Sequence, residues 1–173
     1  MDPWEWCERA AMFNDHFLSK LFVNPEYGGQ DCDTTVFLSR FTEGPGSLVL
    51  EVGANEEASC RILADNGYRI LGMDLRRHDW RLPHNYARME GDFVRLAPFL
   101  RCEFDAVFST SAIEHFGLPL YSFHTKVEDY DSQAMDWMHR LLKQGGSCYI
   151  TVPYGKEFIG EGDWRVYDAE TLR

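Results

Sequence analysis

Residues 47–53 read Ser-Leu-Val-Leu-Glu-Val-Gly, and this stretch decides the fold. It is a short apolar run that ends in an acid and then a glycine, which predicts a buried strand followed by a tight turn. The next segment, 56–66, places Ala58, Ile62 and Leu63 on one face, so we expect a helix there. A strand followed directly by a helix is the first half of a βαβ unit.

The same alternation continues toward the C-terminus. The further elements expected are strands over 68–74, 86–89, 104–110 and 147–152 and a helix over 131–143. Strands that alternate with helices at this spacing predict an α/β fold with three αβα layers, in which helices cover both faces of a mostly parallel sheet. Ligands of such sheets bind beyond the carboxyl ends of the strands, so the residues after each strand are the candidates for function.

The first 46 residues differ in character from the rest. A period close to 3.6 from Phe13 onward predicts a helix that ends at Asn24-Pro25, and a second short helix is expected over 34–41. We interpret residues 1–46 as an N-terminal helical cap or lid and residues 47–173 as the domain that carries the chemistry.

Composition excludes several classes of function. The chain has 173 residues and a formal net charge of -11, which suits one acidic domain and disfavours nucleic-acid binding. No apolar run approaches the roughly 18 to 20 residues of a membrane helix. The five cysteines form no C-x-x-C pair and the histidines show no metal spacing, so we expect no metal site. A reducing cytoplasm is the expected compartment.

Residue types after the strands point to a nucleoside-like ligand. Gly53 allows the backbone to approach a ligand, and Asp74 suits the two hydroxyls of a ribose. Asp92 could accept a hydrogen bond from an exocyclic amine while Phe93 packs on a flat base. Glu114 and the residue after it, a histidine, would lie over the reactive end of that ligand.

Residues 47–153 resemble class I S-adenosylmethionine-dependent methyltransferases, which have a Rossmann-like fold. The segments that carry the resemblance are LVLEVGAN (48–55), ILGMDLR (70–76), EGDF (90–93), FDAVFSTSAIEHFG (104–117) and HRLLKQGGSCYITVPYG (139–155). The last two are the most specific. The stretches EHFGLPLY, VPYGKE and DWRVYD are similar, more loosely, to bacterial methyltransferases of glycan and natural-product gene clusters.

The resemblance implies S-adenosylmethionine as the cofactor and a set of residues that bind it. These are Glu51, Gly53, Ala54, Asn55, Asp74, Leu75, Asp92, Phe93, Ser109 and Thr110. His115 is the candidate general base, because a neutral imidazole can take a proton from an acceptor hydroxyl, and Glu114 stands behind it. The expected acceptor is an oxygen or nitrogen of a small molecule or sugar, and aromatic residues such as Tyr154, Trp164 and Tyr167 are candidates for its walls.

Two departures from the family pattern keep other functions open. Asn55 and Glu57 stand where the family has further glycines, and only 20 residues follow Pro153. The C-terminal strands of the family fold are therefore expected to be missing, with 168–173 as the start of the next helix. An exposed edge strand would then favour a homodimer. The alternatives are a catalytically silent scaffold or binding subunit and a nicotinamide-dependent oxidoreductase, although residues 53–58 read GANEEA instead of G-x-G-x-x-G.

Overall fold

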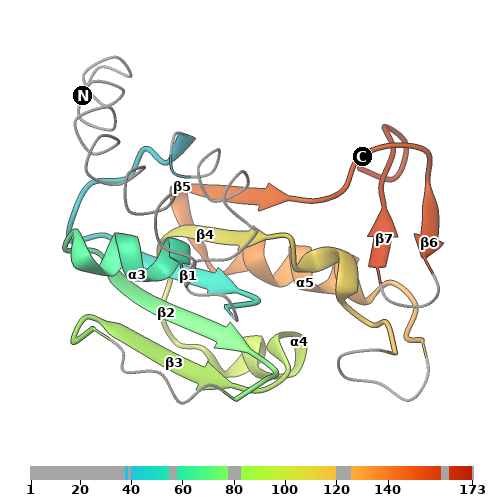
Figure 1. Cartoon of the computed structure of the whole chain (residues 1–173). Helices are drawn as coiled ribbons and strands as arrows, with labels where there is room; N and C mark the ends of the chain where they lie inside the picture. The colour runs from blue at the N-terminus through green and yellow to red at the C-terminus, as the bar shows by residue number, and fades with distance from the viewer. Residues whose placement is uncertain are drawn as a thin grey trace.

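A five-stranded parallel sheet forms the centre of the computed structural model, which describes residues 38, 40–54, 58–77, 83–119, 126–160 and 164–172 (Figure 1). The strands are β1 (Leu48–Val52), β2 (Arg69–Asp74), β3 (Tyr86–Glu90), β4 (Phe104–Thr110) and β5 (Leu142–Thr151). Their order is β3-β2-β1-β4-β5, and every neighbouring pair is parallel. The predicted strands and their parallel pairing are confirmed.

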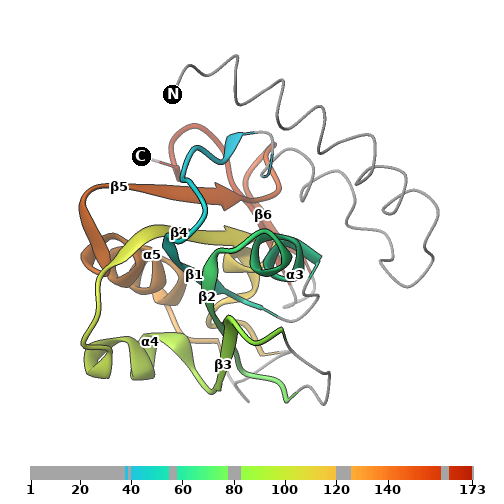
Figure 2. The ribbon, with the colours of Figure 1, turned by 90° about the vertical axis from the view of Figure 1, so that its left-hand side faces the viewer.

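Helices cover both faces of this sheet, as predicted. Figure 2 shows α3 (Ala58–Asp65) on one side and α4 (Phe93–Leu96) and α5 (Tyr130–Arg140) on the other. Adjacent residues of β1 serve the two sides in turn: Val49 packs in the core with α3, whereas Leu50 packs in the core with α4 and α5. Because successive side chains of a strand point to opposite faces, a continuous apolar run is what a doubly covered strand requires.

The strand order reverses between β1 and β4. The chain runs outward from β1 through β2 to β3 and then returns to place β4 on the other side of β1. Ligands of open parallel sheets bind at such a reversal, beyond the carboxyl ends of the strands. The segments that follow β1 and β4 therefore border the candidate site.

The boundary between α5 and β5 was predicted wrongly. The helix was expected to reach residue 143, but it ends at Arg140, and β5 already begins at Leu142 opposite Phe104. The ladder with β4 is irregular between Phe104 and Ala106, and this irregularity takes up the extra residues. A side chain at Gly146 would lie 2.8 Å from the carbonyl oxygen of Asp105, so glycine here lets the irregular segment approach β4.

The C-terminal segment forms a hairpin outside the main sheet. Strands β6 (Phe158–Gly160) and β7 (Trp164–Val166) pair with each other in antiparallel fashion. The helix expected to begin at Asp168 is a turn within the described residues. Asp168 does act as its cap, because Oδ1 accepts hydrogen bonds from the N–H groups of Glu170 (2.8 Å) and Thr171 (3.0 Å).

Residues just before β1 pack on the side of the sheet that α3 covers. The ring of Phe41 is fully buried, 5.5 Å from the ring of Tyr68 and 5.3 Å from that of Tyr149. Both tyrosine hydroxyls donate to Glu43, at its carbonyl oxygen (2.6 Å) and at Oε2 (3.0 Å). Residues 1–37 lie outside the described residues, so the cap over 1–46 stays a prediction.

Candidate functional site

The turn at Gly53 places the end of β1 against the segment that follows β4. Gly53 has φ +85°, and a side chain added to it would collide with the side chain of Ala112. The N–H groups of Gly53 and Ala54 both donate to the carbonyl oxygen of Met73, at 2.8 and 3.0 Å. The backbone therefore stays hydrogen-bonded to β2 as it turns out of β1, and the turn uses the left-handed conformation of Gly53, which glycine adopts readily.

Asp74 is the last residue of β2, so its carboxylate lies where the carboxyl ends of the parallel strands meet. Its side chain is 6% exposed, and Oδ1 accepts from the backbone N–H (2.8 Å) and Nε (3.2 Å) of Arg76. The Asp74 carbonyl accepts from the N–H of Gly91 at 2.8 Å, which ties the end of β3 to the end of β2. Leu75, next in the chain, is exposed. Sequence reasoning found Asp74 but missed Arg76.

Asp92 caps α4 and also binds α5. Its Oδ1 accepts from the N–H of Arg95 at 3.4 Å, and its Oδ2 accepts from the Tyr130 hydroxyl at 2.6 Å. Burial, followed by this hydrogen bond, raises the pKa of Tyr130 to about 12. Phe93 is buried as the first residue of α4, where backbone N–H groups have no partner within the helix. Recognition of a base by Asp92 and Phe93 stays a prediction beside this structural role.

The end of β4 is built from polar residues in unusual settings. Ser109 is fully buried and donates from Oγ to the carbonyl oxygen of Val52 at 2.8 Å, which joins the ends of β4 and β1. Thr110 lies opposite Thr151 in β5. Ser111 has φ +47°, an uncommon conformation for a residue other than glycine. Residues held in such conformations cluster at active sites and ligand clamps.

The Glu-His pair lies in a short 3-10 helix, η3 (Ile113–His115), which begins two residues after this left-handed serine. Glu114 is buried, whereas His115 is partly exposed. Glu51, in the neighbouring strand β1, is buried as well. One buried carboxylate lies near the end of β1 and the other in the short helix after the adjacent strand β4; burying carboxylates is costly and is typical of sites that bind donors or move protons.

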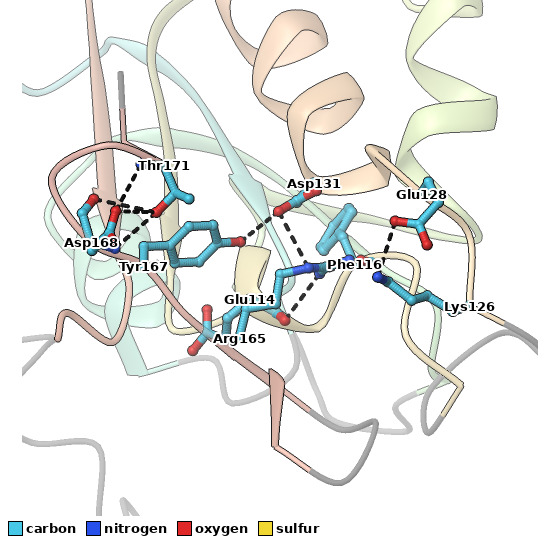
Figure 3. Close-up of polar contacts among 9 residues, drawn as sticks. All are labelled: Glu114, Phe116, Lys126, Glu128, Asp131, Arg165, Tyr167, Asp168 and Thr171. Atoms are coloured by element: carbon cyan, nitrogen blue, oxygen red, sulfur yellow. Dashed lines mark hydrogen bonds and ion pairs between the residues drawn. The ribbon is translucent and has the colours of Figure 1, made fainter. Parts of the chain in front are cut away.

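Sequence reasoning missed a polar cluster beside η3, which Figure 3 shows. Asp131 belongs to a run of acidic residues in the sequence, yet it is buried, and its Oδ2 lies 3.5 Å from Nε of Arg165. The Tyr167 hydroxyl donates to Oδ2 of Asp131 at 2.8 Å. A signal was present in the sequence: Asp131 is three residues before Ala134 and seven before Met138, so it shares their buried face.

The predicted aromatic walls divide into two groups. Tyr167 is buried, and burial and its hydrogen bond to Asp131 raise its pKa, so its side chain is part of the packed interior. Tyr154 and Trp164 are exposed, and the Trp164 ring lies 5.0 Å from that of Phe158 in an edge-to-face arrangement. Their part in binding an acceptor stays a prediction.

Some candidate residues cannot be placed. Asn55 and Glu57 lie outside the described residues, as do residues 78–82 and 120–125. Over the part of the chain that the structure describes, no three His, Cys, Asp or Glu side chains gather as metal ligands would. In the same part, no helix has the length and apolar character needed to cross a membrane.

Comparison with known proteins places this geometry in a family. Residues 50–150 match the family model described as a methyltransferase domain. No curated protein matches the chain.

Three solved structures show the same fold. The first is the glycopeptide N-methyltransferase MtfA (15% identity, 75% of this chain, 56% of that chain, TM-score 0.55). The second is the [4+2]-cyclase SpnF (21% identity, 80% of this chain, 52% of that chain, TM-score 0.60). The third is the Burkholderia thailandensis 1,6-didemethyltoxoflavin-N1-methyltransferase with bound S-adenosylhomocysteine (16% identity, 99% of this chain, 76% of that chain, TM-score 0.59). The chain thus spans about half to three quarters of their lengths. At these identities the likeness concerns the fold alone.

Proposed function

The chain belongs to the methyltransferase domain family, and from this premise we propose that it transfers a methyl group from S-adenosylmethionine to an oxygen or nitrogen of a small molecule or sugar. The observation that carries the proposal is the set of carboxylates at one edge of the sheet. Glu51, Asp74 and Asp92 belong to the ends of three adjacent parallel strands, β1, β2 and β3. Three acceptors in this arrangement suit a ligand with several separated donors.

The chemistry of these residues fits the cofactor. S-adenosylmethionine presents a cationic amino group, a ribose diol and an exocyclic adenine amine, all of which donate hydrogen bonds. Glu51 would hold the amino group, Asp74 the diol and Asp92 the adenine amine. The left-handed turn at Gly53 keeps the backbone close to the same edge. The acid at Asp74 has one oxygen, Oδ1, engaged by Arg76, so Oδ2 is the atom we expect to meet the diol.

Once bound, the cofactor supplies a methyl group that its sulfonium already activates. The chain then has to hold the acceptor in line with that group, exclude water and remove a proton. His115 is the residue we propose to take the proton, because it is partly exposed in η3, the short helix that follows β4. Glu114 is buried beside it in the same short helix and would orient or stabilise the imidazole.

A specific observation favours a second candidate, a silent scaffold or binding subunit. Asp92 is already engaged by Tyr130, and Oδ1 of Asp74 by Arg76. In the sequence, Asn55 and Glu57 stand where the family pattern has glycines, and Glu57 adds a negative charge. The scaffold would keep the fold and these internal contacts but would bind no cofactor.

Calorimetric titration with S-adenosylmethionine and S-adenosylhomocysteine separates the two. We expect micromolar binding that Asp74→Asn weakens by about tenfold or more, the value of one charge-assisted hydrogen bond pair. The matched control is Asp65→Asn, an exposed acid at the end of α3 on the opposite edge of the sheet, which should change nothing. A folded chain that binds neither compound would exclude the methyltransferase and favour the scaffold.

The role of His115 needs a turnover assay. With a panel of hydroxyl and amine acceptors and S-adenosylhomocysteine release as the signal, His115→Ala should lower kcat by about 10²-fold or more. Its affinity for S-adenosylhomocysteine should stay close to that of the unaltered chain. Unchanged turnover would remove His115 from the mechanism and leave positioning of the acceptor as the source of the rate.

A further inference from the structure

The C-terminal hairpin contributes a buried arginine to the candidate site. Arg165 lies in β7, outside the five-stranded sheet, and only 8% of it is exposed. Arginine is almost never buried to this extent unless its charge and its donors are matched. The groups that match it belong to two segments distant in sequence, the turn after β4 and the helix α5.

Two backbone carbonyls of the turn and one carboxylate of α5 surround the guanidinium (Figure 3). Nη1 donates to the carbonyl oxygens of Phe116 at 2.6 Å and Glu114 at 3.2 Å. Nε lies 3.5 Å from Oδ2 of Asp131, and the same oxygen accepts from the Tyr167 hydroxyl at 2.8 Å. The side chain of Arg165 therefore connects the turn that holds Glu114 and His115 to α5.

This turn needs a partner from outside. Helix η3 has only three residues, and within the turn its Ile113 and His115 carbonyl oxygens accept from backbone N–H groups, whereas the Glu114 carbonyl oxygen accepts from Arg165. It is preceded by the left-handed Ser111 (φ +47°) and followed by Gly117 (φ +74°), where a side chain would come within 2.5 Å of the Val127 carbonyl oxygen. A strained turn persists only when its surroundings fix it. Arg165 supplies donors to two of its carbonyl oxygens.

Stability alone does not account for the arrangement. A buried ion pair loses so much hydration that apolar residues of similar volume often stabilise a fold equally well. What the guanidinium adds is direction, because its rigid fork fixes the two carbonyls relative to Asp131.

We propose that Arg165 is a positioning residue, which holds the turn bearing Glu114 and His115 in the geometry used for methyl transfer. This rests on the proposed function, and it makes the β6–β7 hairpin part of the working site.

The test compares Arg165→Met and Arg165→Lys with the matched control Arg101→Met, an exposed arginine away from the turn. Hydrogen exchange of the free protein reads the geometry directly. The N–H groups of His115, Phe116 and Leu118 donate within the turn, at 3.0, 3.0 and 3.1 Å. In Arg165→Met we expect their protection to fall by about tenfold or more, while the amides of β2 keep theirs.

Turnover and cofactor affinity complete the test. We expect Arg165→Met to lower kcat by about tenfold or more while the Kd for S-adenosylhomocysteine stays within about twofold. Arg165→Lys should recover part of kcat, because an ammonium can reach the carbonyls or Asp131 but lacks the fork that reaches both.

Three results would overturn the inference. One is unchanged protection of the turn in a folded Arg165→Met; if that variant does not fold, unchanged protection in Arg165→Lys has the same meaning. Another is a loss of protection spread equally over β2, which would mark a general loss of stability. The third is an unaltered kcat in a chain that turns over. If the unaltered chain binds no S-adenosylhomocysteine, the proposed function fails, whereas the exchange data still decide whether Arg165 fixes the turn.

Discussion

Replacing Gly53 by alanine should cost more stability than the same change at Gly46. Both glycines have left-handed backbones, with φ +85° and +91°. They differ in what a side chain would meet, because Gly46 faces open space, whereas Gly53 faces the side chain of Ala112. The pair therefore separates the cost of the conformation from the cost of crowding between β1 and the segment after β4.

The two costs have different sizes. A left-handed backbone disfavours an alanine by about 1–2 kcal/mol, and this should be the whole effect at Gly46. At Gly53, forcing a methyl group against Ala112 adds about 1–3 kcal/mol of overpacking. Apart from the Ala112 methyl group, the nearest atom to a Cβ added at Gly53 is the Ala112 Cα, 3.8 Å away, which is an ordinary contact. The Ala112→Gly change should therefore remove the crowding and leave only the conformational cost.

Urea unfolding of the four proteins of this double-mutant cycle measures the coupling directly. We expect Gly53→Ala to be rescued by Ala112→Gly with a coupling of about 1–3 kcal/mol, and Gly46→Ala to show none. Equal losses at Gly46 and Gly53, or a coupling near zero, would refute the close approach of these two segments. The candidate site would then have a different shape from the one described.

The other predictions concern hydrogen bonds around the site and the behaviour of the fold with pH. Tyr130→Phe removes the 2.6 Å hydrogen bond to Asp92 and should lower the free energy of unfolding by about 1.5–3 kcal/mol, because the acceptor is a carboxylate. Urea unfolding measures this loss, and a loss below about 0.5 kcal/mol would show that α4 does not depend on the bond. Burial comes first among the causes that raise the pKa values of Tyr68 and Tyr130 to about 12. Since their folded pKa values exceed the unfolded value near 10, the stability that these two tyrosines contribute should be constant below pH 10 and fall between about pH 10 and 12. Stability that circular dichroism finds unchanged between about pH 10 and 12 would contradict this. The hydrogen bond from Lys143 is the main cause that lowers the pKa of Asp105, so the stability that this carboxylate contributes should be lost as pH falls below about 4. Asp105→Asn should reduce this acid sensitivity, and an acid transition that the substitution leaves unaltered would contradict the prediction.

The central sheet could be predicted because each strand carries its own signal. The run 48–52 is apolar throughout, as a strand covered on both faces must be, and its length excludes a helix of ordinary size. The start of β5 could not be predicted in the same way. Residues 142–146 have no alternation, and their place in the sheet depends on an irregular ladder opposite Phe104 and Ala106. Such pairing is decided by the neighbouring strand and not by the local sequence.

The candidate site was predictable where it follows from position at the end of a strand. Asp74 is the last residue of β2 and Asp92 follows β3 by two residues, so the parallel topology alone brings both to the carboxyl ends of the strands. Arg165 was not predictable, because nothing near it in the sequence indicates burial, and its partners lie more than thirty residues away. The contacts of Asp92 with Tyr130 likewise form only when α4 and α5 pack together.

Amide chemical shifts recorded during a titration with S-adenosylhomocysteine would test the proposed cofactor site most directly. We expect saturable shifts for residues at the carboxyl ends of the strands, among them Gly53, Leu75, Phe93 and Ser111. We expect no change at Asn66 and Gly67, which lie at the opposite end of the sheet. Shifts confined to that opposite end, or no shifts in a folded chain, would contradict a cofactor site built on the ends of β1 to β4.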